Sequence, residues 1–297
     1  SWRTQPDPDE ICERAAGIGE NHFSIYVCGE GGSIYIQNVR IQKGARWMLI
    51  HDFVSGNKPV MVFIHGVLTP WQVWMPQIEF YKNRYNVYAV SLNAHTEETT
   101  SEFISVCAEA EEIIRRLKER GIRAIDVLCG ISLGGKIAHE IWKNGKIEVL
   151  NLVLDGAPLI RCPKFAVRMM INNYKSIIHR SKRREAKVIE NYKRYFLPEK
   201  YLESYLKIAD RMSDASIENM VNSVFAGGEL RTSANKSRIL FIHGTKANEV
   251  LSKKSARLMK KYYPETRIVC FKGSAHCYTM IYQPEQWIEC VERFLQE

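Results

Sequence analysis

A serine framed by two glycines follows a strand-like apolar run near the middle of the chain. Residues 124–129 form that run, the motif Gly-Ile-Ser-Leu-Gly occupies 130–134, and a helix is predicted over 135–144. This context is typical of a sharp strand-to-helix turn that presents a serine hydroxyl. Such a turn is strained and crowded, and a side chain at Gly130 or Gly134 would block it. The pattern therefore predicts that Ser132 is a nucleophile.

Strand-like and helix-like segments alternate along most of the chain, which predicts an α/β fold. The alternation indicates a mainly parallel sheet with helices on both faces. Residues 158–235 interrupt it with a largely helical segment, interpreted as an inserted cap, so the predicted core comprises residues 1–157 and 236–297. Strands are predicted at 33–41, 47–54, 60–64, 85–91, 124–129, 149–154, 239–243 and 267–271, and helices at 101–120, 135–144, 252–262 and 284–294.

Composition limits the class of protein. The 297 residues are 45% hydrophobic and 25% charged, as in ordinary globular domains. No apolar stretch reaches the roughly 18–20 residues of a membrane span, and the first residues lack the apolar core of a secretory signal. The eight cysteines are scattered without a C-x-x-C pair, which argues against a zinc site or a disulfide framework. We therefore expect a cytoplasmic protein without a metal.

The excess positive charge belongs to one segment. Residues 158–200 hold 12 Lys/Arg and 3 Asp/Glu, and 12 − 3 = +9 equals the net charge of the whole chain. The densest run, residues 179–184, could contact nucleic acid or an anionic membrane surface. No aromatic stacking pattern accompanies it, so a solvated helix face is favoured and no nucleic-acid partner is expected. Six apolar residues of the segment could line a pocket over Ser132, although most are expected only to pack: Met169, Met170, Tyr174, Tyr192, Tyr195 and Phe196.

A serine hydroxyl is a good nucleophile only when a base removes its proton, and the oxyanion of the tetrahedral intermediate needs N–H donors. His276 comes directly after the last predicted strand, where sheet ends and loops converge, and is the candidate base. The backbone N–H groups of Leu133 and Val67 are the candidate oxyanion-hole donors, the first at a helix N-terminus and the second in a tight loop after strand 60–64. His95, in a loop after strand 85–91, could contact substrate or lie on the surface.

Together these motifs resemble the α/β-hydrolase superfamily. The resemblance rests on residues 63–66 (FIHG), 130–135 (GISLGG), 154–158 (LDGAP) and His276, and it covers about residues 30–297. It implies a sheet of the eight-stranded type, a Ser–acid–His triad in that chain order and a variable cap at 158–235. It identifies no subfamily and does not fix the substrate.

The acid of the triad departs from the superfamily's pattern. The resemblance implies an Asp or Glu about three residues after the glycine that ends the penultimate strand, and Ala247 stands there. Glu249, through a slightly longer loop, and Asp155, at the end of the preceding strand, are the alternatives. The third explanation is that the acid is absent, because the site is a dyad, because the acid was lost or because Ala247 was engineered. Without an acid the imidazole would be poorly held.

These observations favour a serine hydrolase that acts on a small carboxylic ester, or on a lactone, thioester or amide, through an acyl-enzyme. No cofactor is expected, the partner is a small ester-type molecule, and the oligomeric state is not predicted. The alternatives are an acyltransferase that uses the same serine and a ligand-binding or sensing protein on a degenerate hydrolase fold.

Overall fold

The computed structural model describes residues 22–28, 34–40, 48–225, 233 and 235–296, and the chain divides into two compact units, Ser1–Arg46 and Trp47–Glu297. In the first unit, β1 (His22–Cys28) pairs antiparallel with β2 (Ile34–Arg40). The strand predicted at 33–41 therefore exists, but it lies in a two-stranded sheet of its own. Residues 1–46, which the sequence analysis assigns to the core, form a compact unit by themselves.

The second unit is built on a seven-stranded sheet in the order β3-β5-β4-β6-β7-β8-β9. Strand β3 runs antiparallel to β5, and every other neighbouring pair is parallel. The predicted mainly parallel sheet is confirmed, with seven strands in place of the eight that the resemblance implied, since β2 pairs with β1. The strands are β3 (Leu49–Phe53), β4 (Val60–Ile64), β5 (Asn86–Ser91), β6 (Ala124–Ile131), β7 (Glu148–Asp155), β8 (Arg238–Gly244) and β9 (Arg267–Phe271).

Helices flank this sheet, as its central strands require. Every residue of β5 and nearly every residue of β4 is buried, which is typical of parallel strands covered on both faces. Helix α4 packs on β6 and β7, α9 packs on β8 and β9, and α11 packs against α2. The helices around the sheet are η1 (Trp71–Trp74), α2 (Met75–Tyr81), α3 (Val106–Glu119), α4 (Leu133–Asn144), η3 (Ala247–Glu249), α9 (Val250–Tyr262), α10 (Tyr278–Tyr282) and α11 (Pro284–Gln296).

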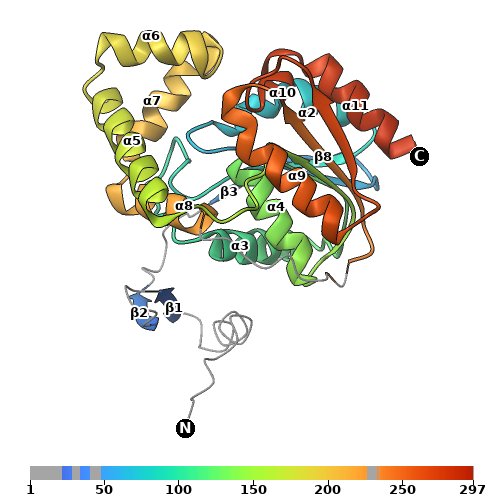
Figure 1. Ribbon diagram of the computed structural model, residues 1–297. Helices are drawn as coiled ribbons and strands as arrows, with labels where there is room; N and C mark the ends of the chain where they lie inside the picture. Colours follow the sequence, from blue (N-terminus) through green and yellow to red (C-terminus); the bar gives the residue numbers. More distant parts are fainter. Residues whose placement is uncertain (1–21, 29–33, 41–47, 226–232, 234, 297) are drawn as a thin grey trace. The chain divides into compact units, whose positions relative to one another are not determined.

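The segment that interrupts the alternation is helical. It contains α5 (Lys164–Lys182), α6 (Ala186–Tyr195), η2 (Glu199–Tyr201), α7 (Leu202–Arg211) and α8 (Asp214–Phe225), and α5 to α7 form a yellow group beside the sheet in Figure 1. Tyr192 is buried and stacks on Tyr205 with 4.3 Å between ring centroids, so it holds these helices together. Met169 and Tyr195 are mostly exposed.

The basic side chains at the end of α5 have polar partners within the segment. Arg180 and Arg183 both bind Glu185, at 2.6 Å each, and Arg184 binds Asp210 through two hydrogen bonds of 2.7 Å. Lys182 donates to the carbonyl of Met212 at 2.8 Å. The four Lys and Arg side chains of this run therefore bind two carboxylates and one backbone carbonyl of the chain itself.

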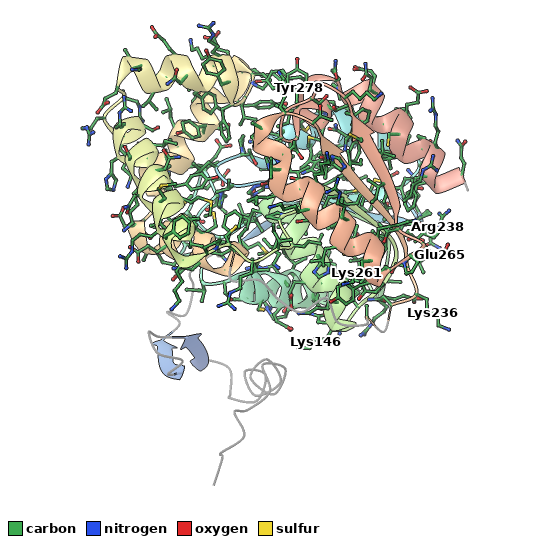
Figure 2. The ribbon with its side chains drawn as sticks, in the orientation of Figure 1. Lys146, Lys236, Arg238, Lys261, Glu265 and Tyr278 are labelled. Atoms are coloured by element: carbon green, nitrogen blue, oxygen red, sulfur yellow. The ribbon has the colours of Figure 1, made fainter. Side chains whose placement is uncertain are left out.

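The carboxyl ends of the parallel strands meet at one edge of the sheet. Lys146 and Lys236 precede β7 and β8, and Tyr278 follows β9; Figure 2 shows Tyr278 at the opposite end of this unit from the two lysines. Residues that follow β4, β6, β8 and β9 therefore come together near Tyr278. No helix in the described part of the chain is long and apolar enough to span a membrane.

Candidate active site

Ser132 occupies the turn between β6 and α4 in a strained conformation. Its φ of 50° and ψ of −115° fall outside the usual regions for a residue with a side chain. Its N–H donates to the carbonyl of Asp155, at the end of neighbouring β7, over 2.8 Å. The strand-to-helix turn predicted from the motif is therefore present, and it is fastened to the next strand.

The glycines of the motif are required by close backbone contacts. A Cβ on Gly130 would lie 2.2 Å from the carbonyl oxygen of Gly134. A Cβ on Gly134 would lie 2.2 Å from the carbonyl oxygen of Ile64 and 2.4 Å from that of His65. These are backbone atoms, so no side chain can move aside to make room.

Replacing Gly134 with alanine is therefore expected to lower the free energy of unfolding by about 3 kcal/mol or more. Urea unfolding would measure the change. Gly66→Ala is the matched control, because its nearest contact would be an ordinary 3.4 Å to the Cβ of Ser132, and we expect a loss of about 1 kcal/mol or less. Equal losses in the two variants would contradict this account of the turn.

His276 joins Ser132 to a carboxylate. Its Nε2 lies 2.9 Å from the Oγ of Ser132, and its Nδ1 lies 2.7 Å from the Oε1 of Glu249. Glu249 ends the short helix η3 after β8, and His276 lies in the loop after β9. Because a carboxylate can only accept, Nδ1 carries the proton and Nε2 is left to accept the hydroxyl proton of Ser132. A continuous hydrogen-bonded chain thus runs from Ser132 to Glu249.

The carboxylate of Glu249 is held in its charged form. Its residue is 1% exposed, and burial alone raises the pKa of the carboxyl group. The hydrogen bond from the Nδ1–H of His276 leads the effects that outweigh burial, so the pKa of Glu249 lies below its ordinary value. A buried negative charge therefore faces the ring nitrogen opposite Ser132.

Asp155, the other candidate acid, has a different partner. Its Oδ2 accepts a hydrogen bond from the indole nitrogen of Trp287 over 3.1 Å. Burial, together with the nearby charge of Glu249, raises the pKa of Asp155 to about 7. The structure thus brings Glu249, and not the carboxyl of Asp155, to the Nδ1 of His276.

This raised pKa gives a prediction for stability. A folded pKa of about 7 against an ordinary 3.8 means that protonated Asp155 favours the native state, so its contribution is full below 3.8 and is lost as pH rises through 7. The unfolding free energy of the natural chain should fall relative to Asp155→Asn between about pH 4 and about pH 7. Urea unfolding across that range would show it, and parallel pH profiles would contradict it.

The candidate oxyanion donors belong to segments next to Ser132. Leu133 is the first residue of α4, so its N–H has no partner within the helix. Val67 is half-buried in the loop after β4. This loop lies against the serine, because a Cβ on Gly66 would be 3.4 Å from the Cβ of Ser132. Both N–H groups belong to segments that border the serine side chain.

His95 is not a surface residue. It is 1% exposed, and its Nε2 accepts a hydrogen bond from the N–H of Leu68 over 3.0 Å. The sequence reasoning placed His95 in the right loop but missed this contact with the segment that follows Val67. Sequence spacing contains no signal for a side chain that bridges two loops.

Solved structures with the same fold include hydrolases and esterases. A protein of Desulfitobacterium hafniense assigned to the α/β-hydrolase family is 21% identical, with a TM-score of 0.65 over 83% of this chain and 100% of that one. MenH of S. aureus is 18% identical, with a TM-score of 0.64 over 84% of this chain and 98% of that one. The esterase EaEST of Exiguobacterium antarcticum is 17% identical, with a TM-score of 0.65 over 93% of this chain and all of that one. No family model matches the chain.

The strand order, the turn at Ser132 and these likenesses define the class: the chain has the α/β-hydrolase fold, and the resemblance seen in its motifs is confirmed at that level. A protein named pimeloyl-[acyl-carrier protein] methyl ester esterase, of Nitrosomonas europaea, is 23% identical over an alignment of 259 positions that covers 82% of this chain and 98% of that protein.

Proposed function

We propose that this chain hydrolyses a small carboxylic ester through an acyl-enzyme formed on Ser132. The observation that carries the proposal is the hydrogen-bonded chain from the Oγ of Ser132 through His276 to buried Glu249. Esterase names among the similar proteins support the same class of reaction.

In the first half of the reaction Ser132 attacks the ester carbonyl. The Nε2 of His276 removes the hydroxyl proton as the new C–O bond forms. The charge that develops on the carbonyl oxygen is stabilised by the N–H groups of Leu133 and Val67. The tetrahedral intermediate collapses when the protonated ring donates its proton to the departing alcohol.

The second half repeats these steps with water. His276 takes a proton from a water molecule that attacks the acyl group on Ser132, and returns it to the serine oxygen as the acid leaves. Each step uses side chains and backbone groups of this chain, with no added cofactor in the scheme. An added alcohol that competes with water would divert the same intermediate to acyl transfer.

Glu249 is the proposed acid of the triad. Its 2.7 Å contact with Nδ1 fixes the tautomer in which Nε2 can accept a proton, and its charge stabilises the imidazolium that forms. Asp155 is assigned a structural role instead, because its carboxyl is engaged by Trp287. The gap at Ala247 is thus filled by a carboxylate two positions further along the chain.

An active-site labelling experiment tests the proposal. A fluorophosphonate probe should react with the folded protein at about one site per chain, and peptide mapping should locate the label on Ser132. Heat-denatured protein is the control, because it lacks the activated serine. p-Nitrophenyl acetate and butyrate should then show a burst of about one equivalent of product before steady turnover. Labelling at another residue would overturn the proposal. Turnover of an ester by a protein that takes up no label would also overturn it.

A further inference from the structure

Two buried histidines lie side by side near the site and take no part in the proposed reaction. His65 directly follows β4 and His95 lies in the loop after β5, and they are 0% and 1% exposed. Their ring centroids are 5.0 Å apart. A buried polar ring is costly unless hydrogen-bonded, so its partners indicate its purpose.

Each ring accepts a backbone N–H from the other's loop. The Nε2 of His95 accepts from Leu68 over 3.0 Å, and the Nε2 of His65 accepts from Leu92 over 3.1 Å. Because a backbone N–H can only donate, both Nε2 atoms are unprotonated. Each Nδ1–H donates to a carbonyl, that of Asn93 at 3.0 Å for His95 and that of Gly66 at 2.8 Å for His65. The two loops are therefore fastened to each other by a reciprocal pair of neutral rings.

Burial agrees with the neutral form. It lowers the pKa of His95 to about 4, against the opposing effect of the Asn93 carbonyl. It also lowers the pKa of His65 well below the ordinary value, with the neighbouring His95 adding to the effect. The acceptor nitrogens are thus free of protons at neutral pH.

The fastened loops hold strained backbone. Five non-glycine residues of the described part of the chain have positive φ, and four of them lie in the two loops or in the Ser132–His276 site: Leu68 at 56°, Ala94 at 62°, Ser132 at 50° and Cys277, next to His276, at 53°. Such conformations persist only where surrounding contacts enforce them, and they gather at functional sites. Leu68 donates the hydrogen bond that the Nε2 of His95 accepts, and Ala94 directly precedes His95 in the chain.

The loop of His95 is itself anchored to α3. The N–H and the side-chain amide of Asn93 donate to the two carboxyl oxygens of Glu109, at 3.1 and 2.8 Å. Glu109 is buried in α3, and the Oδ1 of Asn93 accepts the N–H of Met48. His95 therefore links residues 66–68 to a loop that is held in place by α3.

We propose that His95 is a positioning residue for the oxyanion hole. By holding the N–H of Leu68, its Nε2 sets the peptide geometry of the preceding residue and so aims the Val67 N–H at the reacting carbonyl oxygen. This inference rests on the proposed function, since it assigns His95 to the hole used by Ser132. Oxyanion donors are effective only when fixed in advance at the right place, so loss of the support should cost transition-state binding in particular.

Three variants and a control test the inference. His95→Leu removes the acceptor, and His95→Gln offers a side-chain oxygen at a similar reach. His95→Asn keeps a polar group that is too short, and it replaces the leucine variant if that one does not fold. His139→Leu is the matched control, because His139 is a buried histidine of α4 whose ring nitrogens have no hydrogen-bond partner among the described residues.

For p-nitrophenyl ester hydrolysis, His95→Leu or His95→Asn should lower kcat by about 10- to 100-fold with KM changed less than about threefold. A boronic acid, which forms a tetrahedral adduct with the serine, should lose affinity by a similar factor. His95→Gln should regain most of both, and His139→Leu should lose neither.

Normal kcat and boronate affinity in a folded His95→Leu or His95→Asn variant would overturn the inference, as would a folded glutamine variant with no recovery. These results are distinct from failure of the proposed function, which would appear as full turnover in Ser132→Ala. Loss of activity in Ser132→Ala beside full activity in the His95 variants would leave the function standing and remove only the positioning role.

Discussion

Replacing Ser132 with alanine is expected to lower kcat for p-nitrophenyl acetate by about 10⁴-fold or more. The proposed reaction forms its covalent intermediate on the Oγ of this residue, and an alanine methyl group cannot replace it. The fold should be unaffected, because the backbone bond from the N–H of residue 132 to the carbonyl of Asp155 does not involve the side chain. Steady-state rates and fluorophosphonate labelling on the same samples would measure both effects.

Ser223→Ala is the matched control for that experiment. Ser223 lies in α8, and its hydroxyl donates to the carbonyl of Met220 in the same helix, so its loss should leave kcat unchanged. Retained turnover in Ser132→Ala, with an unchanged urea midpoint, would show that another group is the nucleophile. The hydrogen-bonded chain through His276 would then need a different explanation.

Glu249→Gln is expected to lower kcat by about 10³- to 10⁴-fold, the second-largest effect. The amide has nearly the same shape as the carboxylate, but it has no charge with which to stabilise the imidazolium and can stabilise the wrong ring tautomer. Asp155→Asn should lower kcat by less than about tenfold, since an amide oxygen can still accept from Trp287. The comparison separates the two candidate acids.

The measurement is kcat against pH for both variants and the natural chain. A large loss in Asp155→Asn with a small one in Glu249→Gln would transfer the role of acid to Asp155. Small losses in both would contradict a three-residue mechanism altogether. Thermal unfolding of each sample would show that a lost rate does not reflect lost fold.

The sequence predicted the site most successfully where chemistry imposes local spacing. The turn at Ser132 needs glycines at fixed positions, and the candidate base was sought after the last strand, so the proximity of Ser132 and His276 could be predicted without coordinates. The acid could not be fixed, because the short helix η3 carries the chain two residues past Ala247 and turns Glu249 back toward His276. A loop path of that kind depends on packing rather than on periodicity.

Elements without a clear period were also missed. Helix η1 and α2 begin after Pro70 in a stretch rich in aromatic residues, and α10 has only five residues. The burial of His95 was missed for a related reason, since its partner Leu68 lies 27 positions earlier in the chain. The pairing of β2 with β1 was not foreseen, because alternation predicts a strand without naming its neighbour.

Asp155 has a consequence beyond its own position. Its carbonyl holds the N–H of Ser132, while its carboxyl holds the indole of Trp287 in α11. One residue thus links the turn at Ser132 to the final helix, so that helix supports the proposed reaction centre. A substitution that displaces Trp287 in this last helix would therefore be transmitted through Asp155 to the backbone of Ser132.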